Sequence, residues 1–336
     1  MSNIYDNEQG IEEQPTFADA LAELKSEEGI VPSSDLLVGL SNLTAEEIEQ
    51  LSPVLTNLDP TYRRVLMQML VDYGEANYEL NYQPIARANL HAPLAEVRQA
   101  ALELLVAADN LDLLGDIIKL AQTDDVLDVR TEAIRQLGNF VLLGELEDLP
   151  HEQTQIAEEV LLIILSDASL NTVERSYALE AISHCSRKGI ANIIQDAYNT
   201  DDDTLRQSAV VAMGHSCDAK RWSKQVLAEL ESRDPDMRHR AAGAAGELQL
   251  EDAVPMLVNI LDTDDRDAQE TAIWSLGEIG GGEALNILQR AALIAEEAED
   301  EELLILIDDA INSASLMNGD LFMMTDFDDF DIETDD

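Results

Sequence analysis

The segment LRQSAVVAMG at residues 205–214 decides the fold, because its pattern returns along the chain. An apolar residue precedes an Arg, an Ala follows three residues after the Arg, and the segment closes with a Gly. The pattern recurs, in places with substitutions, as VRQAALELLV at 97–106, VRTEAIRQLG at 129–138, ERSYALEAIS at 174–183, MRHRAAGAAG at 237–246 and AQETAIWSLG at 268–277. The Arg position falls at 98, 130, 175, 206, 238 and 269, so most units are 31 or 32 residues long. A fixed period of this length indicates a repeat architecture.

Each unit continues with a second apolar run, for example GIANIIQDAYNTDD at 189–202 and DAVPMLVNILDTDD at 252–265. The apolar spacing of three and four in both runs predicts two helices per unit. We expect the Gly to end the first helix and permit a tight turn, and the Asp cluster to cap the next first helix. A column of small residues should let successive helices approach closely; it consists of Ala101, Ala133, Ala178, Ala209, Ala241 and Ala272.

Over about residues 93–295 the repeat resembles the HEAT-like repeats of the phycobilisome-lyase type. The resemblance implies an all-α fold, an α-solenoid of about six to seven helical-hairpin repeats. It implies no particular activity, because one fold serves many functions. In HEAT-like repeats, Arg–Asp ladders tie neighbouring units together, so Arg98, Arg130, Arg175, Arg206 and Arg238 are interpreted as structural.

The chain divides into five segments on composition and periodicity. We expect an acidic, mostly disordered segment over 1–34, with one short amphipathic piece around Phe17–Leu24. A helical cap with a decayed repeat over 35–92 should precede the solenoid of 93–299, since DPTYRRVL at 59–66 echoes DPDMRHRA at 234–241. A capping helix over 300–317 and an acidic, aromatic and disordered tail over 318–336 complete the chain.

One step of the repeat is longer than the others. Arg130 and Arg175 are 45 residues apart, and the extra chain includes LGELEDLPHEQ at 143–153. We expect a lengthened helix end and an exposed loop there, followed by a helix that begins near Pro150. Insertions in solenoids usually form loops on one face. Deletion of 144–152 should therefore leave thermal stability nearly unchanged.

The formal net charge of −49 restricts the partners. Phosphate contacts need clusters of Lys and Arg, so nucleic-acid binding is excluded from the expectations, and so is attraction to an anionic membrane. Basic protein surfaces are favoured instead. We find no signal peptide pattern at MSNIYDNEQG and no run of 18 apolar residues, and we expect a cytoplasmic protein.

The sharpest group of chemically reactive residues is His184–Cys185 with His215 and Cys217, at matching corners of adjacent units. Two His and two Cys can bind zinc in principle. The equivalents of Cys185 are Phe140, Leu248 and Ile279, so Cys185 is interpreted as a core residue. Polar residues hold the register position of His184 and His215 elsewhere, so we interpret it as exposed. We therefore expect no metal site.

Catalytic motifs such as GxSxG, HExxH, GxxxxGK[ST] and GxGxxG are absent from the sequence. We therefore expect a non-catalytic protein–protein interaction scaffold, with no catalytic residues and no cofactor. Two alternatives stay open. One is a bilin lyase, which only the type of repeat suggests. The other is an acidic chaperone or nucleic-acid mimic for a basic client.

Two regions are candidates for partner binding. The second helices should line the concave face and present polar positions: Asn192, Gln195, Asp196, Asn199, Lys224, Glu231 and Asn259, with Leu227, Ala228, Val258 and Asp262 beside them. In the tail 318–336, apolar residues alternate with acids, a composition typical of segments that fold on a partner. Phe322, Phe327 and Phe330 are the expected anchors.

Overall fold

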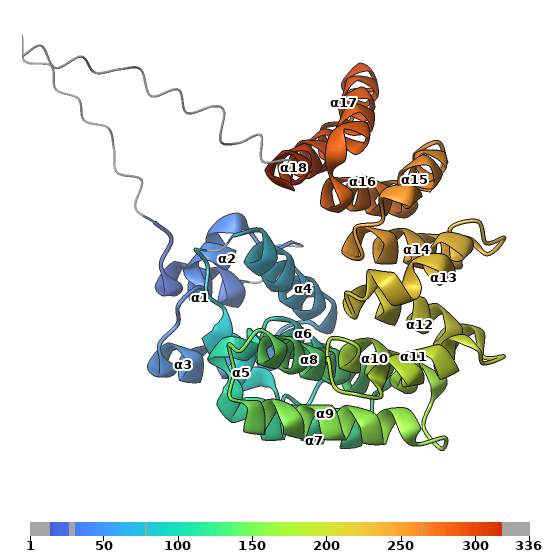
Figure 1. Ribbon diagram of the computed structural model, residues 1–336. Coiled ribbons are helices and arrows are strands. Elements are labelled where there is room, and N and C mark those ends of the chain that lie inside the picture. The colour runs from blue at the N-terminus through green and yellow to red at the C-terminus, as the bar shows by residue number, and fades with distance from the viewer. Residues whose placement is uncertain (1–13, 27–30, 78, 264, 318–336) are drawn as a thin grey trace, which may run out of the picture. The chain divides into compact units, whose positions relative to one another are not determined.

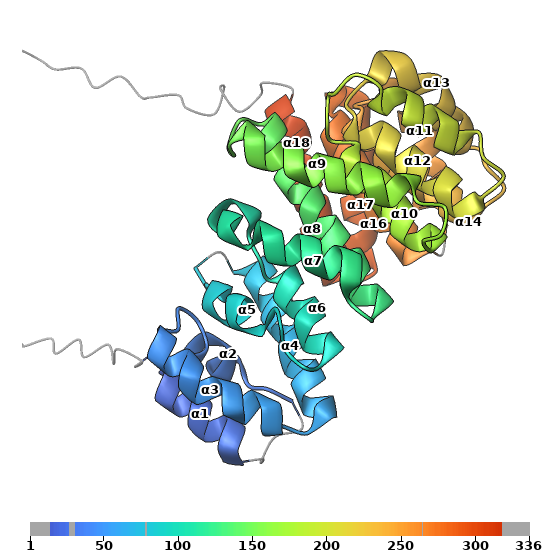
Figure 2. The same ribbon diagram turned by 90° about the horizontal axis from the view of Figure 1, so that it is seen from below.

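The computed structural model is described for residues 14–26, 31–77, 79–263 and 265–317, and every regular element in these ranges is a helix (Figures 1 and 2). The all-α fold class expected from the periodicity is confirmed. The chain forms two compact units, Met1–Ala157 and Glu158–Asp336, each with its own packed helices. In the described part of the chain no helix is long and apolar enough to cross a membrane.

The first unit contains nine α-helices within its described residues, the last of which continues into the second unit. They are α1 (Phe17–Ser26), α2 (Ser34–Gly39), α3 (Ala45–Asn57), α4 (Pro60–Ala76), α5 (Gln83–Asn89), α6 (Ala95–Glu103), α7 (Leu114–Thr123), α8 (Leu127–Glu145) and α9 (His151–Ser166). Helix α1 packs on α2 and buries Ala20 and Leu24. The expectation of a mostly disordered segment over 1–34 therefore does not hold for residues 17–26, which form a helix. The amphipathic period of this piece is enough to fold it once α2 and α3 supply an apolar surface.

Helix α4 has the features of a repeat helix, as its echo of 234–241 suggested. Asp59 caps it and accepts hydrogen bonds from the N–H groups of Thr61 and Tyr62, and Pro60 stands in the first turn. The buried guanidinium of Arg63 donates to three carbonyls of the preceding turn, those of Leu55, Thr56 and Leu58. Arg63 occupies the register position of Arg238, so α4 behaves as the first helix of an early repeat.

The second unit is an orderly stack of hairpins. Its first helices are α10 (Thr172–Ile182), α12 (Asp203–His215), α14 (Pro235–Glu247), α16 (Arg266–Ile279) and the closing helix α18 (Glu301–Met317). Its second helices are α11 (Ile190–Tyr198), α13 (Ala219–Glu229), α15 (Val254–Leu261) and α17 (Gly281–Glu297). The closing helix expected over 300–317 corresponds to α18.

Successive first helices pack directly on one another, whereas the described parts of α11, α13 and α15 make few contacts among themselves. The first helices therefore lie on the inner side of the curve of this unit, and the second helices lie on its outer side (Figure 1). An ion pair supports this, because Arg240 of α14 reaches Glu180 of α10 at 3.8 Å past the intervening α12. The expectation that the second helices line the concave face is wrong for this unit.

Small side chains explain why the first helices, and not the second helices, pack closely from one repeat to the next. All six residues of the Ala column are completely buried. The Gly of the repeat pattern is inside or near the end of the first helix, and it does not adopt a left-handed conformation. A Cβ atom on Gly277 would lie 2.9 Å from the Cα atom of Ala310 in α18. Our expectation that this Gly ends the helix is wrong; its role is close approach of the next first helix.

The expected caps are present in most repeats. The side chains of Asp202, Asp234 and Asp265 each accept a backbone N–H at the start of α12, α14 and α16. Asn171 forms a reciprocal capping box with Glu174 at the start of α10. These bonds satisfy donors that a helix leaves free at its first turn, so each acidic inter-repeat turn fixes where the next first helix begins.

The long step of the repeat is helical rather than a projecting loop. Helix α8 continues to Glu145, the turn spans 146–150, and α9 begins at His151, next to Pro150 as expected. The side chains of Leu149 and Thr154 are buried, and a Cβ atom on Gly144 would lie 2.5 Å from the Thr154 side chain. The expected lengthened helix end is present in α8, and the turn 146–150 is exposed except at Leu149. The expected projecting loop is replaced by this short turn between two packed helix ends, because the extra residues have apolar positions at helical spacing.

Candidate partner-binding surfaces

The first helices of the second unit share one row of positions, which we call the first-helix face; Ser176 and Ser208 in this row are buried, and the other positions are exposed or partly buried. In each repeat it comprises the residues one, two, five and nine positions after the Arg of the pattern. The members are Ser176, Tyr177, Glu180, His184, Gln207, Ser208, Val211, His215, His239, Arg240, Gly243, Glu247, Glu270, Thr271, Trp274 and Glu278. The two large aromatic residues are exposed, Tyr177 by 37% and Trp274 by 44%.

Contacts between neighbouring helices hold this face in place. Ser208 of α12 donates a hydrogen bond to the Glu180 carboxylate of α10. His239 of α14 shares a hydrogen bond with the Thr271 hydroxyl of α16 at 2.9 Å. The Ser275 hydroxyl donates to the Ala242 carbonyl at 2.8 Å. Burial raises the pKa of Glu180, while the bond from Ser208 and the charge of Arg240 oppose that shift.

The two histidines of the sharpest sequence motif meet on this face. The rings of His184 and His215 stack with their centroids 4.3 Å apart. His215 Nδ1 lies 3.2 Å from both the Ser183 hydroxyl and the Glu180 carbonyl oxygen. Burial, together with the neighbouring His215, lowers the pKa of His184 to about 4. The expectation that His184 and His215 are exposed is therefore wrong. They are partly buried, because the close approach of α10 and α12 covers them.

The cysteines do not join these histidines in a ligand set. Cys185 is buried, as expected for an equivalent of the buried residues Phe140, Leu248 and Ile279, and Cys217 is exposed. Within the described ranges, no group of three or more His, Cys, Asp or Glu is arranged to hold a metal ion.

Glu247 is the most perturbed carboxylate of the face. His215 Nε2 lies 3.5 Å from Glu247 Oε1, and Oε2 is buried without a hydrogen-bond partner among the described residues. A Cβ atom on Gly214 would lie 2.5 Å from Oε2, so α12 covers this oxygen. Burial raises the pKa of Glu247 to about 7. Its charge state therefore changes near neutral pH.

The Arg column binds the turns between repeats. Arg98, Arg130 and Arg238 each donate from Nη1 to the carbonyl six residues earlier, at 2.8–2.9 Å. Gln269 replaces the Arg in the last repeat and donates to the carbonyl of Thr263, also six residues earlier. Arg98 also forms a bidentate pair with Asp124 of the next turn, Arg206 pairs with Glu229, and Arg175 donates to the Leu165 carbonyl. These contacts support the structural interpretation of the column.

The second-helix positions named from the sequence lie on the outer surface. Asn192, Asp196, Asn199, Lys224, Ala228, Glu231, Asn259 and Asp262 are exposed, and Gln195, Leu227 and Val258 are partly buried, so none of them belongs to the core. Hydrogen bonds link neighbouring rows, from Arg221 to Asn192 and from Gln225 to Gln195. The tail positions Phe322, Phe327 and Phe330 lie outside the described residues.

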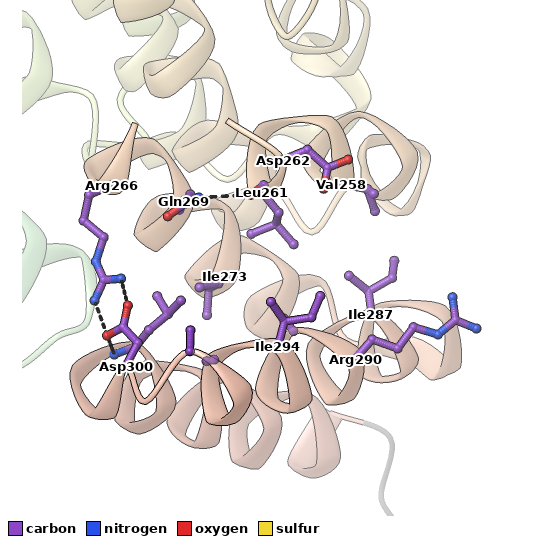
Figure 3. Close-up of a pocket in the computed structure, with 14 residues that line it drawn as sticks. Val258, Leu261, Asp262, Arg266, Gln269, Ile273, Ile287, Arg290, Ile294 and Asp300 are labelled. Atoms are coloured by element: carbon purple, nitrogen blue, oxygen red, sulfur yellow. Dashed lines mark hydrogen bonds and ion pairs between the residues drawn. The ribbon is translucent and has the colours of Figure 1, made fainter. Parts of the chain in front are cut away.

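A pocket of about 400 Å³ lies among α15, α16, α17 and α18 (Figure 3). Ile287 and Ile294 of α17 point toward α15, and Ile273 of α16 lines the floor. Arg266 is held at one end by Asp300 and Glu270. Ile294 is 68% exposed, because α17 extends well beyond the shorter α15. Sequence periodicity alone did not reveal this pocket; the signal that we overlooked was the greater length of the run 281–297.

A model of HEAT repeats matches residues 223–302, which contain most of α13 and all of α14 to α17. This match identifies the repeats within residues 223–302 as HEAT repeats. Comparison with curated proteins finds no match.

Several solved structures are similar at low sequence identity. An engineered protein is 18% identical, with 60% of this chain and 96% of that chain covered and a TM-score of 0.38. Importin beta is 15% identical, with 89% of this chain and 44% of that chain covered and a TM-score of 0.42. E. coli YibA is 15% identical, with 86% of this chain and 99% of that chain covered and a TM-score of 0.41.

Proposed function

We propose that this chain is a non-catalytic scaffold that binds a partner protein on the first-helix face. The observation that carries the proposal is the exposure of Tyr177 and Trp274 on a face otherwise held by hydrogen bonds between helices. HEAT-like solenoids present extended surfaces of this kind to partners.

The composition of the face suits protein recognition. Trp, Tyr and Arg are enriched among the residues that dominate binding energy, and Tyr177, Arg240 and Trp274 stand on three different first helices. Aromatic side chains have few rotatable bonds, so little conformational entropy is lost when a partner covers them. The inner side of the curve can surround an extended or helical segment, whereas the outer side can contact only a flat surface.

The test is capture of partners from a native lysate, with the full chain as bait. Replacing Tyr177 and Trp274 together with Ser removes the two exposed aromatic rings and leaves every charge in place. The matched control replaces Leu293 of α17 and Ile305 of α18, which are exposed and lie outside the pocket of Figure 3, with Ser. We expect the first pair to lose proteins that the wild type and the control retain. Identical recovery by all three baits would contradict the proposal.

A second candidate function is recognition of a basic client, and the pocket of Figure 3 favours it. The pocket wall is apolar at Ile273, Ile287 and Ile294, and the adjoining segment EEAEDEE at 296–302 is strongly acidic. A cationic amphipathic helix would place its apolar side chains in the pocket and its Lys or Arg residues beside these acids.

A synthetic Leu/Lys amphipathic peptide and its Leu/Glu counterpart test the basic-client function. We expect I294S to weaken binding of the Leu/Lys peptide severalfold. I305S should have little effect, because Ile305 is similarly exposed on α18 but outside the pocket. Equal losses in the two variants, or equal binding of the Leu/Glu peptide, would assign the interaction to general surface charge.

Finer assignments also remain proposals. The phycobilisome-lyase subtype of the repeats rests on the sequence pattern, and the cytoplasmic location is likewise a proposal. The bilin-lyase alternative rests only on the type of repeat. The second-helix positions and the three Phe residues of the tail are proposed as additional contacts with the partner protein.

A further inference from the structure

A cluster of basic residues marks one corner of the second unit, in a chain with only 20 Lys and Arg against 69 Asp and Glu. Arg187 and Lys188 stand in the turn before α11, and Arg221 stands in the first turn of α13. All three line one pocket of about 390 Å³. Asp218 is the one carboxylate of that lining, and its side chain accepts the backbone N–H of Arg221 at the start of α13. Outside the lining, the buried carboxylate of Glu158 lies 3.5 Å from Arg187 Nη1, so among the described residues Lys188 and Arg221 are the basic side chains of the pocket without a carboxylate partner at this distance.

The first turn of α11 contributes to the same pocket. Its N-cap residue is Gly189, whose φ of 108° is a conformation that Gly adopts readily and which offers no side-chain cap. Gly189, Ile190 and Ala191 all line the pocket. The N-terminus of a helix carries partial positive charge and free N–H donors, both of which favour an anion.

Trp222 is a buried polar side chain beside the same pocket. Its side chain is completely buried and lines the pocket, yet its indole Nε1 has no acceptor among the described residues. A buried donor without a partner is unfavourable. The Arg221 guanidinium lies 5.0 Å from the centre of the Trp222 ring and donates to Asn192 at 3.0 Å, so its position is fixed.

We propose that this pocket, formed by Arg187, Lys188, Arg221, Trp222 and the first turn of α11, binds a phosphate-type oxyanion. The anion accepts hydrogen bonds from the basic side chains of Lys188 and Arg221, next to the indole ring of Trp222. Local charge outweighs the negative charge of the whole chain, because salt screens charges beyond about 8–10 Å. The site is separate from the first-helix face, since it lies at the corner where α10 leads into α11.

Phosphate could reach the pocket as a free ion or as a phosphorylated residue of a bound protein. The amide row of Asn192 and Gln195, which lies beside Arg221 and Gln225, would extend contacts along a peptide. The shared chemistry is a tetrahedral dianion with oxygen acceptors, for which fixed Arg and helix N-termini are suited.

The experiment uses the full chain with Trp274 replaced by Phe, which leaves Trp222 as the one fluorescent indole. Inorganic phosphate is titrated against sodium chloride at constant ionic strength, and the emission of Trp222 is followed. We expect a saturable change specific to phosphate, with a dissociation constant in the millimolar range or lower. K188Q should weaken binding about fivefold or more. The matched control K220Q should not, because Lys220 is exposed on α13 outside the pocket.

Two further measurements distinguish a free phosphate ion from a phosphorylated protein as the ligand. A neutral peptide with one phosphoserine that binds at least tenfold more tightly than phosphate would support a phosphorylated protein as ligand; equal affinities would support the free ion. Three results would overturn the proposal: no response beyond chloride, equal losses in K188Q and K220Q, or saturation only far above millimolar phosphate. A rise in phosphate affinity after removal of 319–336 would instead assign the pocket to the carboxylates of the tail.

Discussion

Gly246 and Ser275 are in such close contact that a Cβ atom on Gly246 would lie 2.8 Å from the Ser275 Cα atom. The contact joins α14 to α16, and its equivalents join α12 to α14 at Gly214 and α16 to α18 at Gly277. The spacing of the first helices, and with it the form of the first-helix face, depends on these contacts.

Gly246→Ala should therefore destabilise the second unit by about 2–4 kcal/mol, because the methyl group must push α16 away. Gly243→Ala on the same helix is the matched control. Its Cβ atom would meet only the Thr271 methyl group at 3.8 Å, and Ala favours helix over Gly by up to about 1 kcal/mol. Urea denaturation measures both. The two variants should shift stability in opposite directions; a shared sign would show that helix spacing does not depend on Gly246.

Gln269 shows that an uncharged amide can make the turn hydrogen bond that Arg makes in the other repeats. Since Gln269 donates to the carbonyl six residues earlier, as Arg238 does, Arg238→Gln should change the free energy of unfolding by less than about 0.5 kcal/mol. Arg238→Leu removes the donor and should cost about 1–2 kcal/mol. Thermal or urea unfolding distinguishes these outcomes. An equal loss in both variants would mean that the charge of Arg238, and not its hydrogen bond, stabilises the turn.

The turn between α8 and α9 should be sensitive to change at its buried side chain. Leu149→Ala should destabilise the first unit by about 2–3 kcal/mol, because Leu149 is 9% exposed. Leu146→Ala, in the same turn but 60% exposed, should have an effect below about 0.5 kcal/mol. Deletion of 144–152 should lower the melting temperature by several degrees at least. An unchanged melting temperature would instead support the exposed loop that the sequence suggested.

Glu247 should make stability depend on pH. Burial raises its pKa in the folded state to about 7, above the ordinary 4.5. The folded state therefore disfavours the ionised form, so this group reduces stability progressively as pH rises from about 4.5 to about 7.

Glu247→Gln removes that effect. The variant should gain about 1–2 kcal/mol relative to the wild type at pH 8 and much less at pH 5. His184 acts in the opposite direction, since burial lowers its pKa to about 4 and folding is weakened as pH falls below about 6.5. Urea denaturation of wild type and variant at the two pH values measures the difference; a gain independent of pH would contradict the assigned pKa.

Sequence periodicity was sufficient to predict the repeat register and the burial of its Ala column. The pattern also predicted that the Asp clusters between repeats cap the next first helices, as Asp202 and Asp265 do. These features are local, because a helix start needs a side chain three residues away, and a core face needs a fixed period along one helix. The segment around Phe17–Leu24 was recognised as amphipathic, but whether it folds depends on α2.

Which layer forms the inner side of the second unit was decided by tertiary packing. Both helices of a hairpin have an apolar face, so the period does not distinguish them. The distinction comes from contacts between repeats: Gly and Ala draw the first helices together, whereas Asn192 and Gln195 occupy outward positions on the second helices. Packing between repeats also produces three further features. These are the stacking of His184 on His215, the burial of the Trp222 indole without an acceptor among the described residues, and the basic corner at Arg187. Each joins residues about 30 positions apart that become neighbours only when one repeat packs on the next.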